Sequence, residues 1–447
     1  MRVLLLPLLA CTEPSADDAR RAWLVERLIE ANAVWLAREP EAVEHQFAKM
    51  DADPYDFLRG TASVFLTDLA RPVPGRAPTS FLTLPDASVT WVVGDPHLEN
   101  LGTSLVGPES AATAEAVSTL EWVDLDAAAR GPWTTDTRRA ALALVLLFDG
   151  CGCADRGVEA FARAYAGELE SPGWDPAGDP DDGRWADELR ADAREDGLAG
   201  EALADRLSDE PGALLARTPI DDAGEGFVSL TADEEALVAH LTDQWSRRPA
   251  GWRALDAVRQ YGKGVASFSA PRFLVAWDTG DDGAGDDHLL QLREVIDPPA
   301  QPGAPPPAPW GPERIDAATA LWSTPDADVL YAGVTDGVGV YKVSTSSGWF
   351  RTFDHGDVIG ELSAGDASVP DAEALGALVG RALARAHADA NGAIVRDDLR
   401  AGGGVEPLVH ERVRDARSDL GQLLVDAELF HQALATLGPA LGAEGLR

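Results

Sequence analysis

Three oxygen-bearing side chains have the types and spacing that phosphoryl transfer requires. Asp95 and Asn100 lie five positions apart in one short segment, and Asp124 follows in a second. Phosphoryl transfer needs one carboxylate to orient or deprotonate an attacking hydroxyl, and oxygen ligands to hold Mg²⁺ against the nucleotide phosphates. We therefore predict that Asp95 is the base and that Asn100 and Asp124 are metal ligands, with Asp126 as a further metal contact.

The same segments allow other interpretations. Gly-Asp and Asn-Leu-Gly are common turn sequences, and Asp-Leu-Asp often ends a strand, so these residues can equally be turn and cap residues. The sequence Gly-Asp-x-His, which ends at His97, also opens the metallophosphoesterase motif. That chemistry needs a later Asn-His pair, which the sequence lacks. We therefore expect His97 to stabilise its loop.

Two other polar residues occur in apolar surroundings. Arg59 pairs either with an internal carboxylate, which we favour, or with a substrate phosphate. His387 lies in a segment with an apolar helical stripe, where a histidine is more often a core residue than a ligand. The sequence shows no Ser-His-Asp order and no Cys-His pattern that would indicate a nucleophilic hydrolase.

Short strands must position the candidate residues. The β-branched residues 89–93 predict a buried strand that delivers Asp95 at its carboxyl end, and residues 120–123 predict one that delivers Asp124. Residues 136–148 predict an apolar helix. We also expect helices at residues 17–38, 55–69, 371–390 and 411–437, and strands at residues 273–277, 289–293, 329–334, 338–343 and 349–353.

The order of these segments predicts an α+β fold with two lobes. Residues 1–18 are expected to be a signal and tether, and residues 19–255 a helical part that carries the catalytic-loop-like motifs. A β-rich lobe with a glycine-containing turn is expected at residues 256–355, followed by C-terminal helices at residues 356–447.

The composition narrows the class of function. The chain of 447 residues is long enough for a large core, and its formal charge is −38, from 75 acidic and 37 basic residues. Such a surface repels phosphate backbones, which argues against sequence-independent binding of nucleic acid. We interpret the acidity as a solubility feature, because no motif indicates a cationic partner. Nearly every base is Arg, and the lysines are Lys49, Lys263 and Lys342.

The first residues predict a location. An apolar run at residues 3–10 precedes Cys11, and residues 8–11 look like a bacterial lipobox, in which the cysteine is lipidated. Lipidation of Cys11 would anchor an extracytoplasmic protein to a membrane through a polar tether at residues 12–18. The alternative is a cytoplasmic protein with a mis-assigned start or a buried first strand. The run itself is too short to span a bilayer.

The other two cysteines, Cys151 and Cys153, flank a single glycine. A disulfide between residues so close is expected to be strained, so we predict a small buried pair instead. Three cysteines in a chain of this length do not indicate a disulfide framework.

Several separated motifs occur in a fixed order along the chain. They are residues 57–60 (Phe-Leu-Arg-Gly), 94–100 (Gly-Asp-Pro-His-Leu-Glu-Asn), 123–126 (Val-Asp-Leu-Asp), 131–133 (Gly-Pro-Trp) with Asp136, 264–268 (Gly-Val-Ala-Ser-Phe) with 290–294 (Leu-Gln-Leu-Arg-Glu), and 385–388 (Arg-Ala-His-Ala). Together they resemble the signatures of the bacterial domain-of-unknown-function family 2252, from about Asp51 to the last helices.

A further similarity is to aminoglycoside and choline kinase-like enzymes, which have an Asp-to-Asn catalytic loop and then a metal-binding Asp. This resemblance implies a two-lobed protein-kinase-like fold with Mg²⁺ and ATP as cofactors, and a structural Asp136 that holds the catalytic loop through backbone hydrogen bonds. The glycine-containing segment at residues 261–294 follows the catalytic loop, whereas kinases place it before. The implied fold is therefore circularly permuted.

The resemblance also implies a nucleotide site. It would comprise Gly262, Lys263, Gly264, Ser267, Arg293 and Glu294. Arg293 stands where these kinases have a phosphate-binding lysine, and a planar guanidinium is not equivalent to an ammonium group. Lys263 is a candidate substitute.

Three hypotheses follow. The first is a phosphotransferase that depends on Mg²⁺ and a nucleotide and acts on an unknown small molecule or protein. The second is a non-catalytic, pseudokinase-like lipoprotein tethered through Cys11, because ATP is scarce outside the cytoplasm. The third is a hydrolase that uses the same acids on a phosphate ester.

Overall fold

The computed structural model describes most of the chain. The described residues are 15–70, 74, 89–106, 117–199, 205–208, 213–280, 288–298, 300–302, 304, 311–324 and 327–441. The lipobox with Cys11 lies outside them. Among the described residues, no helix combines the length and the apolar character that crossing a bilayer requires.

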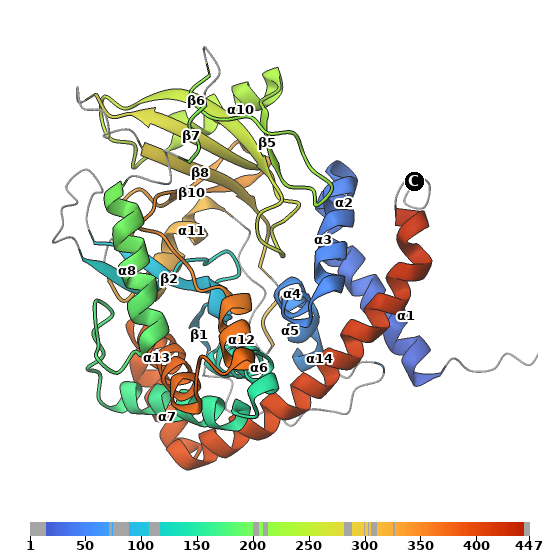
Figure 1. The fold of residues 1–447 in the computed structure, drawn as a ribbon, viewed down its shortest axis with the longest axis vertical. Coiled ribbons are helices and arrows are strands. Elements are labelled where there is room, and N and C mark those ends of the chain that lie inside the picture. The colour runs from blue at the N-terminus through green and yellow to red at the C-terminus, as the bar shows by residue number, and fades with distance from the viewer. Residues whose placement is uncertain are drawn as a thin grey trace, which may run out of the picture.

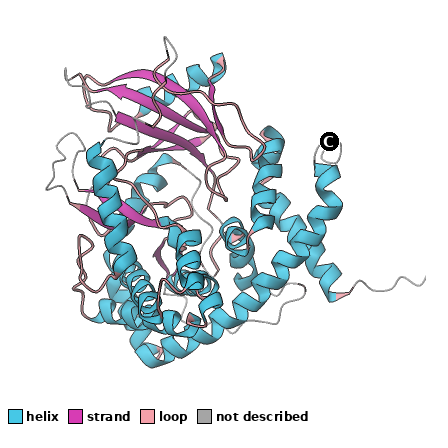
Figure 2. Cartoon of the chain, in the orientation of Figure 1, coloured by secondary structure: helices cyan, strands magenta, loops and turns pink. Residues whose placement is uncertain are grey.

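The architecture is mixed α+β (Figure 1), and the strands of its largest sheet gather at one end of the molecule (Figure 2). The helices that the structure describes are α1 (Ala16–Ala31), α2 (Ala33–Arg38), α3 (Pro40–Ala52), α4 (Pro54–Gly60), α5 (Ala62–Ala70), α6 (Trp133–Leu147), α7 (Ala154–Glu170), α8 (Arg184–Ala199), α10 (Ala232–Gln244), α11 (Pro312–Ala318), α12 (His355–Ala364), α13 (Val369–Ala401) and α14 (Val405–Leu441). Short 3₁₀ turns are η1 (Leu98–Asn100), η3 (Asp149–Cys151) and η4 (Thr319–Leu321).

Local sequence explains where several helices begin. Asp53 caps α4 by accepting hydrogen bonds from the backbone amides of Tyr55 and Asp56, and a proline occupies the first turn of that helix. Thr231 and Glu234 form a reciprocal capping box at the start of α10. These caps satisfy amides that have no partner within the helix.

A six-stranded antiparallel sheet forms the β-rich part. Its strands are β5 (Gly226–Ser229), β6 (Arg253–Tyr261), β7 (Arg272–Asp278), β8 (His288–Val295), β9 (Ala332–Thr335) and β10 (Val340–Thr345), in the spatial order β5-β6-β7-β8-β10-β9. Phe273, Val275 and Trp277 pack with α10 on one face. Because side chains alternate along a strand, Arg272 belongs to the opposite face.

Two small antiparallel pairs hold the candidate loops. Strand β1 (Val89–Val92) pairs with β4 (Ala129–Pro132), and β2 (Leu101–Leu105) pairs with β3 (Ser118–Trp122). The loop from β1 to β2 and the loop from β3 to β4 are joined by a 2.9 Å hydrogen bond from the Val123 amide to the Asn100 carbonyl. The two candidate segments therefore lie side by side.

Most expected elements are present, with four differences. The expected helix at residues 55–69 is interrupted at Thr61, between α4 and α5. The expected helix at residues 17–38 is interrupted at Asn32, between α1 and α2, and the one at residues 371–390 continues to Ala401 with a non-helical residue at Asn391. The expected strand at residues 349–353 is wrong. This segment has a single bridge, from Thr352 to Gly102, and further hydrogen bonds of its backbone join it to Thr103 of β2 without forming a strand.

Cys151 and Cys153 form a disulfide, which corrects the expectation of an unbridged pair. Their Cα atoms are 5.3 Å apart, within the usual range for a disulfide. The turn η3 is followed by Gly152 in the left-handed region, with φ of +67°, and this reversal brings the two cysteines together.

Candidate functional site

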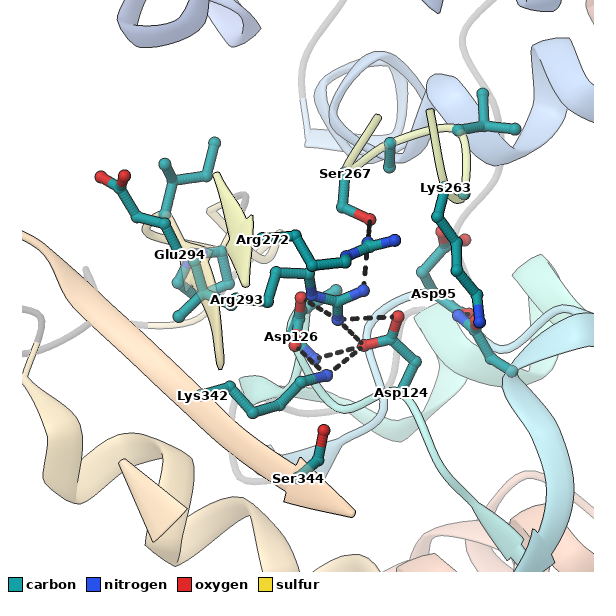
Figure 3. A pocket seen from close by; sticks show the side chains of 18 of the residues that line it. Asp95, Asp124, Asp126, Lys263, Ser267, Arg272, Arg293, Glu294, Lys342 and Ser344 are labelled. Atoms are coloured by element: carbon teal, nitrogen blue, oxygen red, sulfur yellow. Dashed lines mark hydrogen bonds and ion pairs between the residues drawn. The ribbon is translucent and has the colours of Figure 1, made fainter. Parts of the chain in front are cut away.

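A large cavity lies between the six-stranded sheet and the helical part. Its volume is about 1330 Å³, which exceeds the usual size of a single small-molecule site. The loops after β1 and β3 line it from one side, and β8, β10 and the turn before β7 line it from the other (Figure 3). All residues predicted as catalytic, metal-binding or nucleotide-binding line this cavity, except Gly262.

A buried carboxylate holds the start of the loop that carries Asp95. Asp136 accepts hydrogen bonds from the backbone amides of Val93, at 2.6 Å, and Gly94, at 3.0 Å. The His387 ring lies 3.0 Å from Asp136 through Nε2 and 2.8 Å from the Tyr165 hydroxyl through Nδ1. His387 is fully buried, as its apolar surroundings predicted.

Asp95 is itself buried and points toward a cation that the sequence did not suggest. Its Oδ1 accepts a 2.8 Å hydrogen bond from Arg139 Nε, and Arg139 also donates to the carbonyl of Leu58. The only sequence signal is spacing, because Arg139 lies one helical turn after Asp136. Asn100 donates from Nδ2 to the Asp95 carbonyl at 2.9 Å, which leaves its side-chain oxygen as an acceptor.

His97 lies beside Asp95, with 3.6 Å between Nε2 and Oδ2. Burial lowers the pKa of His97 to about 4, against the raising effect of the Asp95 charge. The ring is therefore neutral near pH 7 and does not form a charged pair. The ring Nδ1 is buried without a hydrogen-bond partner, so a loop-stabilising role for His97 stays a prediction.

Asp124 and Asp126 face two cations from the sheet (Figure 3). Arg293 of β8 lies 2.8 Å and 3.0 Å from the two oxygens of Asp124 and also pairs with Asp126. Lys342 of β10 lies 3.1 Å from Asp124 and 2.7 Å from Asp126. Burial opposes ionisation of Asp124, but the charges of Arg293 and Lys342 outweigh it and hold the pKa of this carboxyl well below its usual value.

Lys342 was missed by sequence reasoning. It lies directly opposite Arg293 in the pairing of β10 with β8, so its ammonium reaches the same two acids. The scarcity of lysine was the available signal, because Lys49, Lys263 and Lys342 all line this cavity and the sequence has no others.

The glycine-containing turn contributes Lys263 and Ser267. Gly262 and Gly264 have φ of +80° and +85°, a region open mainly to glycine, so they shape the turn. The Ser267 hydroxyl accepts hydrogen bonds from Arg272 at 3.1 Å and from Arg293 at 3.2 Å.

Glu294 and Arg59 take part in internal ion pairs. Glu294 accepts two hydrogen bonds, at 2.8 Å and 2.7 Å, from Arg38 of α2, so its carboxylate links the sheet to the first helices. Arg59 pairs with Asp56 at 2.7 Å and Glu99 at 2.5 Å. The internal pairing that we favoured for Arg59 is thus present.

The side chains of the two candidate loops offer oxygen donors for a divalent cation. Within the described residues, no group of three or more His, Cys, Asp or Glu side chains is arranged to hold a metal. Asp124, Asp126 and the free oxygen of Asn100 are hard donors that suit Mg²⁺, which commonly takes few protein ligands and completes its shell with water and phosphate oxygens. The residues therefore fit Mg²⁺ that arrives with a phosphate ligand.

Comparison with known proteins identifies a family. The family model described as "Uncharacterized protein conserved in bacteria (DUF2252)" matches residues 38–406. No curated protein and no solved structure matches the chain. The matched region includes both candidate loops, the six-stranded sheet and the long helix α13. The chain belongs to the DUF2252 family of bacterial proteins.

Proposed function

We propose that this protein is a kinase-like phosphotransferase that uses Mg²⁺ and a nucleoside triphosphate. One observation carries the proposal: Asp95, Asn100, Asp124 and Asp126 line one cavity, opposite the cations Arg293 and Lys342 of the sheet. Phosphoryl transfer depends mainly on positioning and on neutralising charge, and this arrangement supplies both.

The ion pairs of Arg293 and Lys342 with Asp124 and Asp126 support a specific way of binding Mg²⁺ and the nucleotide phosphates. Asp124, Asp126 and Asn100 would hold Mg²⁺, which supplies charge neutralisation at the transferred phosphate. Arg293 and Lys342 would then exchange their carboxylate partners for phosphate oxygens, to which both cation types bind well. This exchange would keep Arg293, Lys342, Asp124 and Asp126 paired before and after binding.

Asp95 would orient the acceptor hydroxyl. Arg139 already occupies Oδ1, so Oδ2, which lies 3.6 Å from His97 Nε2, would be the oxygen that meets a substrate. The acceptor is a small molecule or a protein with a hydroxyl or amine. By the resemblance to kinases, Arg293 stands where those enzymes have a phosphate-binding lysine. Lys342 would supply the missing ammonium group, because it lies beside the same acids.

The arrangement of a sheet, a cavity and a helical part also supports a two-lobed, kinase-like organisation. In chain order the Asp95 loop precedes the sheet strands β6 to β10, so the proposed fold is a circularly permuted one. The boundaries at residues 255 and 355 remain part of this proposal, although strands of the sheet begin at Gly226.

A second candidate is a non-catalytic lipoprotein that binds a nucleotide-like ligand outside the cytoplasm. The Cys151–Cys153 disulfide favours it, because disulfides persist mainly in oxidising compartments. Mass analysis of the mature protein from its host tests the location. A diacylated cysteine at the amino terminus supports the tether, and an intact Met1 contradicts it.

Ligand-induced thermal shift tests the main proposal, because a ligand that binds the native state raises its stability. We expect ATP with Mg²⁺ to raise the melting temperature of the wild-type protein, and ATP with EDTA to raise it much less. Asp124→Asn should lose the Mg²⁺-dependent part of the shift. Asp243→Asn, at an exposed carboxylate on α10, is the matched control and should keep it.

Product analysis distinguishes the chemistry. A phosphotransferase should form ADP only with ATP, Mg²⁺ and an acceptor, and Asp95→Asn should abolish this while retaining the nucleotide shift. Release of phosphate from simple esters without a nucleotide would instead indicate the hydrolase. Equal shifts with and without Mg²⁺ in the wild type would contradict the proposed metal role.

A further inference from the structure

Three buried cations form a row across neighbouring strands of the sheet. In the pairing register, Arg272 of β7 lies opposite Arg293 of β8, which lies opposite Lys342 of β10. Directly paired residues project from the same face, so the three charges lie side by side. Their exposed fractions are 3%, 6% and 4%. A row of like charges opposes folding, which calls for a compensating feature.

The acids of the cavity compensate only part of this row. Asp124 and Asp126 pair with Arg293 and Lys342. Arg272 has no acidic partner within the described residues, and its Nε is buried without a hydrogen bond. Its single hydrogen bond is to the hydroxyl of Ser267, which Arg293 shares. Arg272 is therefore a buried cation beside the cavity that feels the charges of Asp124 and Asp126 but forms no ion pair within the described residues.

Lys263, on the turn before β7, adds a fourth cation to the same cavity, and its charge interacts with that of Arg272. The Lys263 side chain is exposed to solvent, but its partial desolvation by the surrounding protein lowers its pKa to about 8, helped by the positive charges of Arg272, Arg206 and Arg293. Burial and the charge of Arg293 likewise lower the pKa of Arg272 to about 9, against the raising effect of Asp124 and Asp126. These shifts mark a site with excess positive charge, in a protein whose formal charge is −38.

We propose that Arg272, Lys263 and Ser267 form a second, metal-independent anion subsite that binds a phosphate group of the nucleotide. A phosphate placed there would pair both cations, and Ser267 would turn its hydroxyl from the guanidinium groups to a phosphate oxygen. The assignment to a nucleotide rests on the proposed function, whereas phosphate binding at this corner does not.

The distribution of lysine supports this assignment. All three lysines line the one cavity, whereas every other basic residue of the chain is Arg. Lys49 of α3 has its Nζ 5.9 Å from the centre of the Phe268 ring and has no ion pair within the described residues. Compact ammonium groups are thus confined to the place where a phosphate ligand is proposed.

Pyrophosphate is the probe that separates this subsite from the metal site. Titration calorimetry with pyrophosphate and EDTA should show binding to the wild-type protein. Arg272→Met should weaken it at least tenfold, because it removes the unpaired cation. The matched control is Arg253→Met, at an exposed arginine on β6, which should leave the affinity unchanged. Asp124→Asn should also retain binding, because no metal is involved.

Lysine labelling of the wild-type protein provides a test without a core substitution. An amine-reactive acylating reagent, followed by peptide mass analysis, should modify Lys263 readily, and pyrophosphate with EDTA should protect it. Lys49 and Lys342, which also line the cavity, serve as internal references for the extent of labelling. Absence of pyrophosphate binding, or unchanged labelling of Lys263 at saturation, would overturn the subsite.

Competition assigns the phosphate to its source. Displacement of pyrophosphate by ADP supports the nucleotide, whereas displacement by glycerol phosphate and not by ADP overturns that assignment. Metal-free pyrophosphate binding without any Mg²⁺-dependent ATP shift would preserve the subsite and remove the proposed function. A Mg²⁺-dependent ATP shift without metal-free pyrophosphate binding would contradict the subsite and leave the proposed function standing.

Discussion

Asp95 and Arg139 form the buried pair on which the geometry of the candidate base depends. Removing one partner of a buried ion pair leaves the other charge uncompensated, which commonly costs about 3–5 kcal/mol. We expect Arg139→Met to lower the free energy of unfolding by about this amount in chemical denaturation. The double variant Asp95→Asn/Arg139→Met should recover part of the loss. Equal stability of the single variant and the wild type would show that the pair carries no such energy.

His355 provides a pH-dependent test beside the cavity. Burial alone would lower its pKa, but interactions with Asp53 and Glu99 raise the pKa to about 9. Because this value exceeds the ordinary value of 6.5, His355 contributes stability that is fully present below pH 6.5 and is lost as the pH rises through 9. The contribution is at most about 3 kcal/mol.

We therefore expect His355→Gln to destabilise the protein at pH 6 and to have little effect at pH 10. Denaturation curves at the two pH values measure the difference. His240→Gln, at an exposed histidine on α10, should show no such change. A loss of stability that is the same at both pH values would mean that packing on Tyr55, rather than charge, accounts for the effect of His355.

Among the elements, strands β7, β8 and β10 carry the cation row, and its members should respond oppositely to neutralisation. Arg272 has no acidic partner within the described residues, so Arg272→Met relieves repulsion and should stabilise the unliganded protein by about 0.5–1 kcal/mol. Arg293→Met removes the partner of Asp124 and Asp126 and should destabilise it. Urea denaturation without phosphate ligands measures both. Two changes of the same sign would contradict the assignment of charges.

The loops after β1 and β3 are held by elements far apart in sequence. Asp136 of α6 bonds to the backbone before Asp95, and His387 of α13 supports Asp136. A rigid loop of this kind fits a site that must place oxygen atoms accurately. The opposite wall comes from a sheet whose core is shared with α10. The cavity therefore lies between two walls that share some core packing, because Val295 of β8 and Val340 of β10 belong to the core of the helical part.

For the protein as a whole, the formal charge of −38 and the cationic cavity predict opposite responses to salt. Raising the ionic strength from 0.1 M to 1 M shortens the screening length from about 10 Å to about 3 Å. Repulsion among surface carboxylates weakens, so the melting temperature should rise. Attraction between the cavity and pyrophosphate also weakens, so the affinity should fall. Thermal melts and calorimetry at the two salt concentrations check both; affinity that rises with salt would contradict the cationic site.

The sequence alone was enough to predict the local features of this protein, namely its short strands and its motifs. The β-branched run before Asp95 and the short strand before Asp124 form strands close to the predicted positions, because alternation and strand propensity are properties of neighbouring residues. The resemblance to the family likewise rests on short motifs, each of which is visible in neighbouring residues of the sequence. The strand prediction for residues 349–353 was wrong, because the conformation of this segment depends on contacts with β2, which is distant in sequence.

The charge partners of the site were decided by tertiary packing. The spacing of Arg139 from Asp136 and the scarcity of lysine single out Arg139 and Lys342, but neither signal indicates that Lys342 reaches Asp124 or that Arg139 reaches Asp95. The register between β7, β8 and β10 places Arg272, Arg293 and Lys342 in one row, and a shift of one residue in any strand would send its side chain to the other face. Residue types therefore indicated the chemistry, whereas long-range pairing selected which groups meet.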